Sequence, residues 1–117
     1  VAKAAKCLAQ AGDVLKKGRS VVIFPEGGWD ETPGMRRFKN GAFQLAIDSG
    51  VPILPVTFKN NYSLFTHHTD FSGNAKPGLA KIVMHKPIET KSLTRKELVS
   101  LRQKTFNTIK NELDSEN

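Results

Sequence analysis

The chain has a single cysteine and no long apolar run, and each shortage excludes a class of protein. Cys7 has no second cysteine to pair with, which excludes an intrachain disulfide and favours a reducing compartment. It lies in an alanine-rich segment, where we expect a helix and a buried, unreactive thiol. No stretch approaches the roughly 20 apolar residues that a membrane-spanning helix needs, and no signal peptide is recognisable. We therefore expect neither a transmembrane protein nor a disulfide-rich secreted one.

Several ligand-binding patterns are missing as well. The chain has no G-x-x-x-x-G-K-[ST] phosphate loop. His67 and His68 are adjacent, so on an extended segment they point to opposite sides, and no cysteine or spaced histidine completes a tetrahedral zinc set. We expect no metal site. The stretch from Thr66 to Asp70 is interpreted as a polar surface loop, and His85 as a hydrogen-bonded strand residue rather than a general base.

Positive charge and apolar residues are present in good supply. The 117 residues carry a formal net charge of +7, and 38% of them are hydrophobic, which fits one globular domain of modest size. A basic surface favours an anionic partner, either a phosphate-bearing substrate, an anionic membrane or nucleic acid. Nucleic acid is the weakest of the three, because exposed aromatic residues interleaved with the cations are lacking. We expect no nucleic-acid partner.

Three segments have the periodicity of helices. Residues 1–17 repeat small and apolar side chains at three- and four-residue steps. Residues 40–50 are apolar nearly all round, with Asn40 as a candidate N-cap and Gly50 as the residue after the helix. A long amphipathic helix begins at Thr94, which forms a capping-box pattern with Glu97. The second of these helices is therefore expected to be buried.

Three apolar runs are predicted to be strands. Residues 20–24 (SVVIF) and 53–58 (ILPVTF) are short and rich in β-branched residues, as buried parallel strands are, and residues 79–88 alternate more loosely. Together with the helices they predict an α/β fold with a mostly parallel sheet flanked by helices. Since three strands make a thin sheet, we expect the full sheet to need further neighbours.

The end of the first predicted strand carries a candidate binding loop. Ligands of open parallel sheets bind just beyond the carboxyl ends of the strands, where this chain has Glu26, Gly27 and Gly28. The glycines allow a ligand to approach the backbone closely. Glu26 has two possible roles: it can accept a hydrogen bond from a substrate hydroxyl, or hold the loop through backbone amides.

A basic cluster follows at the predicted start of the second helix. Arg36, Arg37 and Lys39 lie within four residues, just before Gly41. Guanidinium groups bind phosphate oxygens through paired hydrogen bonds, and the N–H groups of a helix start add to the attraction. A solvated basic loop is the alternative. With the glycine loop a dozen residues upstream, we favour an anion site.

Read together, these blocks resemble the glycerolipid acyltransferases of the lysophosphatidic acid acyltransferase type. In that family a strand runs into Phe-Pro-Glu-Gly-Thr-Arg-Ser, followed by Phe-Lys-x-Gly-Ala, a helix and Val-Pro-Ile-x-Pro-Val. The matching residues form three blocks: Phe24, Pro25, Glu26 and Gly27; Phe38, Lys39, Gly41 and Ala42; then Val51, Pro52, Ile53, Pro55 and Val56. The resemblance covers residues 1–58. Residues 1–117 are accordingly expected to be one partial domain, the C-terminal half of an acyltransferase domain.

The sequence departs from the family pattern in two places. The family's catalytic Asn-His-x-x-x-x-Asp, in which histidine is the general base, lies upstream of the matching blocks. None of the three histidines here is followed by aspartate at that spacing, so we predict that this chain has no catalytic residue and is inactive alone. The family's Thr-Arg is replaced by Gly28 and Trp29. We expect nearby cations to replace that arginine and Trp29 to face the membrane interface or the acyl path.

For the complete enzyme, the resemblance implies transfer of a fatty acyl group in phospholipid biosynthesis. The donor would be acyl-CoA or acyl carrier protein, with no further cofactor, and the acceptor a lysophospholipid such as 1-acylglycerol 3-phosphate. The enzyme would be peripheral on the inner face of the cytoplasmic membrane, with its basic surface against anionic lipid. A homo-oligomer would cover the sheet edge left open in a partial domain. The alternative is a non-enzymatic remnant that binds anionic lipid or phosphate.

Overall fold

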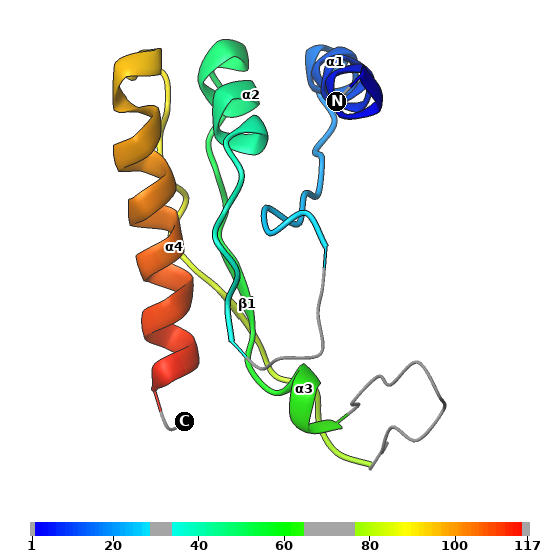
Figure 1. Ribbon diagram of the computed structural model, residues 1–117, viewed down its shortest axis with the longest axis vertical. Coiled ribbons are helices and arrows are strands. Elements are labelled where there is room, and N and C mark those ends of the chain that lie inside the picture. Colours follow the sequence, from blue (N-terminus) through cyan, green and yellow to red (C-terminus); the bar gives the residue numbers. More distant parts are fainter. Residues whose placement is uncertain (1, 29–33, 65–76, 116–117) are drawn as a thin grey trace.

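The computed structural model describes residues 2–28, 34–64 and 77–115 of the chain. Figure 1 shows a long helix on one side, a shorter helix and paired extended segments beside it, and a further helix on the other side. The elements are α1 (Ala2–Lys16), α2 (Gly41–Ser49), β1 (Val56–Phe58), α3 (Asn61–Leu64), β2 (Ile82–Met84), a 3-10 turn (Arg95–Glu97) and α4 (Leu98–Asp114). All three predicted helices are present, and two of the predicted strands are shorter than expected.

The sheet is antiparallel, so the prediction of a mostly parallel sheet is wrong for the described residues. β1 pairs with β2 in the register Val56 to Met84 and Phe58 to Ile82. An isolated antiparallel bridge joins Ile53 and Ile88 and extends this pairing. The error arose because apolar β-branched runs indicate a strand but carry no information about the direction of its neighbour.

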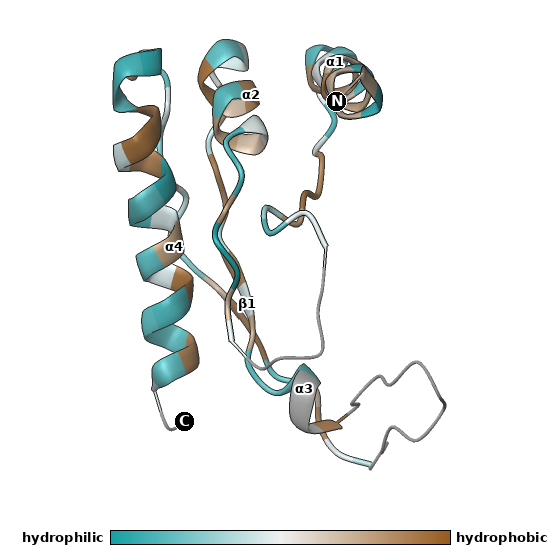
Figure 2. Cartoon of the chain, in the orientation of Figure 1, coloured by the Kyte–Doolittle hydropathy of each residue, from teal (hydrophilic) through white to brown (hydrophobic). Residues whose placement is uncertain are grey.

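Residues 20–24 are also not the buried strand that the sequence predicts. No strand or bridge within the described ranges pairs with them. Val22 is 83% exposed and Phe24 is 70% exposed. In Figure 2 this stretch is the brown, apolar segment that leaves α1, on the side of the molecule away from α4. Strand formation depends on neighbours that supply hydrogen bonds and contact area, and here those neighbours are lacking.

The core lies where the segment leading into α2 meets α4. Its buried apolar residues are Phe38, Phe43, Ala46, Leu98 and Leu101. The ring of Phe38 stacks near Phe43, with centroids 6.2 Å apart, and meets Phe106 edge-to-face at 5.1 Å. Such aromatic pairs contribute beyond the apolar area that they bury. The burial predicted for the second helix is thus confirmed for its inward face.

The ends of the helices follow the sequence signals in most cases. Gly50 has φ 63° and donates to the last carbonyls of α2, as predicted. Thr94 and Glu97 form the predicted capping box, in which the Thr94 amide donates to Glu97 Oε2 over 2.6 Å. The side chain of Asn40 does not cap α2, because its Oδ1 accepts from Arg102 instead.

α1 packs against α2, but none of its residues is fully buried. A Cβ built on Gly41 would lie 2.9 Å from Leu8 Cδ1, so this glycine lets the two helices approach closely. Cys7 is exposed, and the expectation of a buried thiol is wrong. An alanine-rich sequence predicts helix formation well, but it does not show which face of the helix is buried against the rest of the protein.

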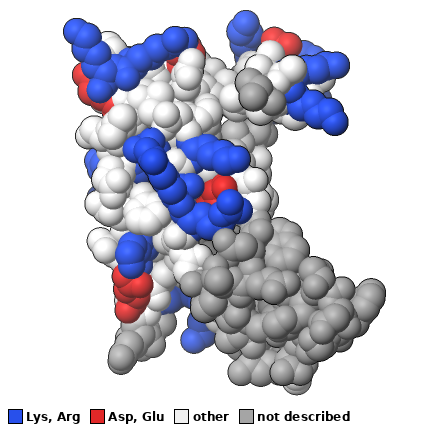
Figure 3. Space-filling view, viewed as in Figure 1, with Lys and Arg blue, Asp and Glu red and all other residues white. Residues whose placement is uncertain are grey.

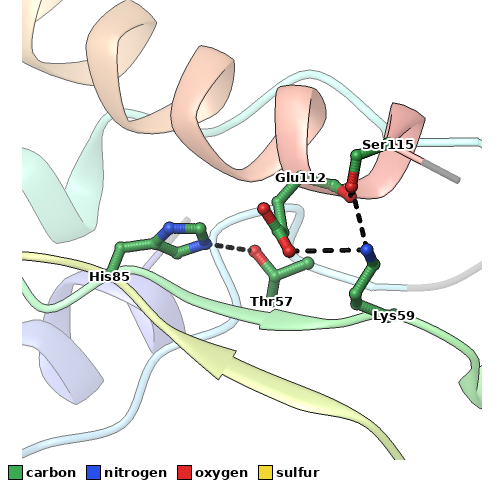
Figure 4. Close-up of polar contacts among 5 residues, drawn as sticks. All are labelled: Thr57, Lys59, His85, Glu112 and Ser115. Atoms are coloured by element: carbon green, nitrogen blue, oxygen red, sulfur yellow. Dashed lines mark hydrogen bonds and ion pairs between the residues drawn. The ribbon is translucent and has the colours of Figure 1, made fainter. Parts of the chain in front are cut away.

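Polar contacts join β1 to its neighbours. His85 Nε2 and Thr57 Oγ1 are 2.7 Å apart, which confirms His85 as a hydrogen-bonded residue (Figure 4). The side chain of Lys59 is only 7% exposed, and its Nζ lies 3.4 Å from Glu112 Oε1 and 2.9 Å from Ser115 Oγ. A buried ammonium needs such partners, so these contacts hold the end of α4 against β1.

Candidate functional site

The candidate anion site is built by two extended segments that lie against each other. The amide of Lys39 donates to the carbonyl of Pro25 over 2.8 Å. The amide of Arg36 donates to Glu26 Oε2 over 2.7 Å. Glu26 therefore holds the loop through a backbone amide, which is the second of the two roles that its position predicts. These two bonds place the glycine pair next to the basic cluster.

Two of the three predicted cations, Lys39 and Arg36, lie beside the glycine pair. A Cβ built on Gly27 would lie 2.7 Å from Lys39 Nζ, so the ammonium lies directly against this backbone. A Cβ on Gly28 would lie 3.2 Å from Arg36 Nη1. Gly27 has φ 70°, a conformation that strains other residues, and any side chain there would also collide with Lys39. The backbone of this turn therefore carries no side chain, and two positively charged side chains lie next to it.

The other two predicted residues lie elsewhere. Arg37 lines a groove beside α4, with Arg102 and Phe106 among its neighbours. Gly41 contacts Leu8 of α1 and serves helix packing. The structure therefore groups Glu26, the two glycines, Arg36 and Lys39, and it separates Arg37 and Gly41 from them.

Sequence reasoning missed the residue that holds this cluster in place. Phe38 lies between Arg37 and Lys39 in the chain, and it is one of the most buried residues of the core. Its contacts with Phe43 and Phe106 anchor the basic segment to both α2 and α4. An aromatic residue inside a run of cations was a usable signal, because a purely solvated basic loop has no need of one.

The surface near this segment is strongly basic. Figure 3 shows Lys and Arg atoms gathered across the middle of one face, around acidic atoms. The carboxylate of Glu26 accepts from the Arg36 amide and makes no other hydrogen bond with the described residues. Two cations beside a glycine turn are suited to a phosphate group, which accepts hydrogen bonds from cations and amides together.

The described parts of the chain also bear on metal binding and on membrane spanning. They contain no group of three or more His, Cys, Asp or Glu side chains that could hold a metal ion. They also contain no helix with the length and hydropathy required to cross a bilayer. Trp29 and the stretch from Thr66 to Asp70 lie outside the described residues.

Comparison with protein families assigns the segment that carries this site. The family model described as Acyltransferase matches residues 1–59 of the 117. The chain belongs to the acyltransferase family. The match ends just after β1 and so includes the glycine turn, the basic segment, α2 and β1 of this acyltransferase-family chain.

Curated relatives carry a consistent description. The chain is 35% identical over 82 residues to the chloroplastic 1-acyl-sn-glycerol-3-phosphate acyltransferase BAT2 of Brassica napus, covering 70% of this chain and 23% of the relative. It is 37% identical over 83 residues to a 1-acyl-sn-glycerol-3-phosphate acyltransferase of Chlamydomonas reinhardtii, covering 71% and 24%. For the enzyme of that description from Salmonella typhimurium, the identity is 45% over 60 residues, covering 50% and 24%.

These relatives are much longer than the chain. It spans about a quarter of the length of each. No solved structure matches it significantly. The comparisons therefore establish the family of this segment, and what a complete protein does is a separate question.

Proposed function

We propose that this chain is the acceptor-binding part of an enzyme that acylates a lysophospholipid, most simply 1-acylglycerol 3-phosphate. The acyl donor would be a thioester of coenzyme A or acyl carrier protein. The acceptor hydroxyl oxygen attacks the thioester carbonyl, the carbon–sulfur bond breaks, and the hydroxyl proton passes through a base to the leaving thiolate. In the family that the sequence resembles, this base is the histidine of a His-x-x-x-x-Asp motif, and the sequence here has no such motif.

The observation that carries the proposal is the approach of Lys39 and Arg36 to the Gly27–Gly28 turn. This geometry suits the phosphate of the acceptor, because two cations and a side-chain-free backbone lie within reach of one small anion. The turn lies in the part of the chain that matches the family. The names of the relatives include a glycerol 3-phosphate ester, which agrees with a phosphate-recognising surface.

The proposal is tested by titrating the chain with glycerol 3-phosphate and following binding by calorimetry. We expect Lys39→Gln and Arg36→Gln each to weaken binding about tenfold, as the loss of one charge-assisted hydrogen bond would. Lys104→Gln is the matched control, since Lys104 is exposed on α4 and removes the same charge from the surface. Equal losses in all three variants would reduce the site to a general charge effect.

Catalysis is tested separately, by thiol release from an acyl thioester in the presence of 1-acylglycerol 3-phosphate. We expect no turnover by the chain alone. Clear turnover would overturn the assignment of the base to residues outside it. If the complete protein also binds the phosphate ester but releases no thiol, the chain belongs to a non-enzymatic lipid-binding remnant.

We also propose a peripheral position on the inner face of the cytoplasmic membrane, supported by the basic face in Figure 3. Flotation with anionic and neutral vesicles tests this, and equal recovery with both would contradict it.

The exposed Val22, Phe24 and Met84 support self-association of the chain. A monomer in light scattering would exclude the proposed homo-oligomer.

A further inference from the structure

A groove runs along α4 that the acceptor site does not use. Its upper part has a volume of about 430 Å³ and is lined by Arg37, Phe38, Arg102, Gln103 and Phe106. Its lower part, of about 260 Å³, is lined by Gly34, Met35, Phe106, Lys110, Leu113 and Asp114. Phe106 lines both parts, so the two adjoin each other along the helix.

The upper end of the groove is positively charged. No carboxylate among the described residues forms an ion pair with Arg37 or Arg102. Arg102 donates from one nitrogen to the neutral amide oxygen of Asn40, and its other N–H groups make no hydrogen bond within the described ranges. A guanidinium has five N–H donors, so two of these groups at one end of a groove favour an anion with several oxygens.

The lower end has a different character. Met35, Phe106 and Leu113 form its apolar surface, and Leu113 is 37% exposed. Lys110 and Asp114 neutralise each other there, with Nζ 2.8 Å from Oδ2. At a rise of 1.5 Å per residue, Leu113 lies about 16 Å from Arg102 along the helix axis, a length that an alkyl chain spans.

We propose that the α4 groove binds a single-chain amphiphile with a phosphate headgroup. The phosphate lies between Arg37 and Arg102, and the alkyl chain follows Phe106 toward Leu113. Charge complementarity selects the head, and the apolar lower end excludes a purely polar anion as the preferred ligand. A sugar phosphate or inorganic phosphate would satisfy the arginines but leave the apolar surface exposed.

This site is separate from the proposed acceptor site. Lys39 and Arg36 lie against the Gly27–Gly28 turn, whereas Arg37 lines the groove on α4. The inference does not rest on acyl transfer, because the groove residues are not those of the proposed acceptor site and only binding is proposed for them. It gives the chain two places for phosphate-bearing lipid, one on each side of the segment anchored by Phe38.

Dodecyl phosphate, below its critical micelle concentration, is the probe for a calorimetric titration of the chain. The double variant Arg36→Gln/Lys39→Gln serves as background, since it removes the cations of the other site. We expect this background to bind dodecyl phosphate at least about tenfold more tightly than dodecyl maltoside or inorganic phosphate. Equal affinity for inorganic phosphate would replace the proposal by a plain anion site, and equal affinity for dodecyl maltoside by non-specific apolar binding.

Single changes on that background then locate the ligand. Arg37→Gln and Arg102→Gln should each weaken binding about tenfold, whereas Lys104→Gln on the same helix should change it less than about twofold. Leu113→Asn should weaken binding of dodecyl phosphate severalfold and leave inorganic phosphate unaffected. Arg37 makes no hydrogen bond to the described residues, so its variant should melt like the parent. Unchanged binding in Arg37→Gln would overturn the proposal.

Discussion

Two apolar segments of similar composition behave in opposite ways in this structure. Residues 20–24 run from α1 as an extended stretch in which Val22 and Phe24 are largely exposed. Residues 53–58 are bridged or paired with residues 82–88, and Thr57 in the middle of β1 is buried. Their composition predicts a strand for both. The difference lies in whether another segment supplies hydrogen bonds and a packing surface.

The chain has a well-packed half and an exposed half. The well-packed half contains α4, α2 and β1, and its stability comes from buried rings and capped helix ends. The exposed half contains α1, residues 20–24 and the glycine turn, and it carries one side of the proposed acceptor site. We expect local opening of the second half to cost less than that of the first, because α1 has no fully buried residue and Val22 and Phe24 are exposed.

The largest expected difference in stability between the packed and the exposed half is seen by comparing two phenylalanines. Phe43 is buried in the core and Phe24 is exposed. Phe43→Ala should lower the free energy of unfolding by about 3–5 kcal/mol, through lost burial and the cavity left behind. Phe24→Ala should change it by less than about 0.5 kcal/mol. Urea denaturation followed by circular dichroism measures both.

If Phe43→Ala fails to fold, Phe43→Leu provides the milder comparison, with an expected loss of about 1 kcal/mol. A loss in Phe24→Ala equal to that in Phe43→Leu would break the division, because it would mean that residues 20–24 are covered in solution. Repeating the measurement at a lower protein concentration would show whether a second copy covers them.

A smaller effect is expected at a buried hydroxyl of the packed half. Thr90 Oγ1 lies 2.6 Å from the carbonyl oxygen of Val51 and 3.2 Å from that of Ala46, and it joins the end of α2 to the segment before α4. Thr90→Val should cost about 1–3 kcal/mol, since it removes the donor to the half-buried carbonyl of Val51. Thr94→Val lies on the surface and removes only a cap, so it should cost about 1 kcal/mol. Thermal melting of the two variants would test the order, and a reversed order would mean that the Thr90 contact is dispensable.

Two glycines separate backbone strain from function in the exposed half. Gly27 and Gly18 have φ 70° and 77°, but only Gly27 has a neighbour, Lys39, within reach of an added Cβ. Gly27→Ala and Gly18→Ala should each lose about 1–2 kcal/mol, because a side chain is strained in this conformation. Only Gly27→Ala should weaken binding of glycerol 3-phosphate. The same loss of binding in Gly18→Ala would show that general destabilisation, and not the position of Lys39, sets the affinity.

The smallest expected effect is a dependence on pH at the start of α4. Hydrogen bonds from the Thr94 side chain, and then from its backbone amide, lower the pKa of Glu97 below 4.5. A lowered folded-state pKa stabilises the fold above the unfolded value, and this contribution is lost as the pH falls through the folded value. The difference in melting temperature between the parent and Glu97→Gln should therefore shrink below pH 4.5. A difference independent of pH would contradict the charged capping box.

The sequence predicted the features that depend on nearby residues. The capping box of Thr94 and Glu97 and the left-handed Gly50 need only a few consecutive residues, and both are present. Strand direction and the exposure of residues 20–24 depend on distant partners, which composition does not identify. The strands were therefore found more reliably than their pairing.

The same distinction applies to the candidate site. Proximity in sequence grouped Arg36, Arg37 and Lys39, but packing of Phe38 separates Arg37 from the other two. Arg102 was missed because it is 62 residues from Asn40, whose side chain it contacts. Only the fold brings these two side chains into contact. The amphipathic pattern of α4 gave no reason to select Arg102 among the cations of that helix.

The position of Phe38 has a consequence for how ligands of this chain are found. Because the ring is buried between α2 and α4, the cations on either side of it keep their places only while the core is folded. Any ligand of these cations should then bind the native state in preference to the unfolded one. By mass action, a ligand at a hundred times its dissociation constant stabilises the native state by about 2.7 kcal/mol. A simple melting screen of phosphate esters would rank candidate acceptors before any catalytic assay exists.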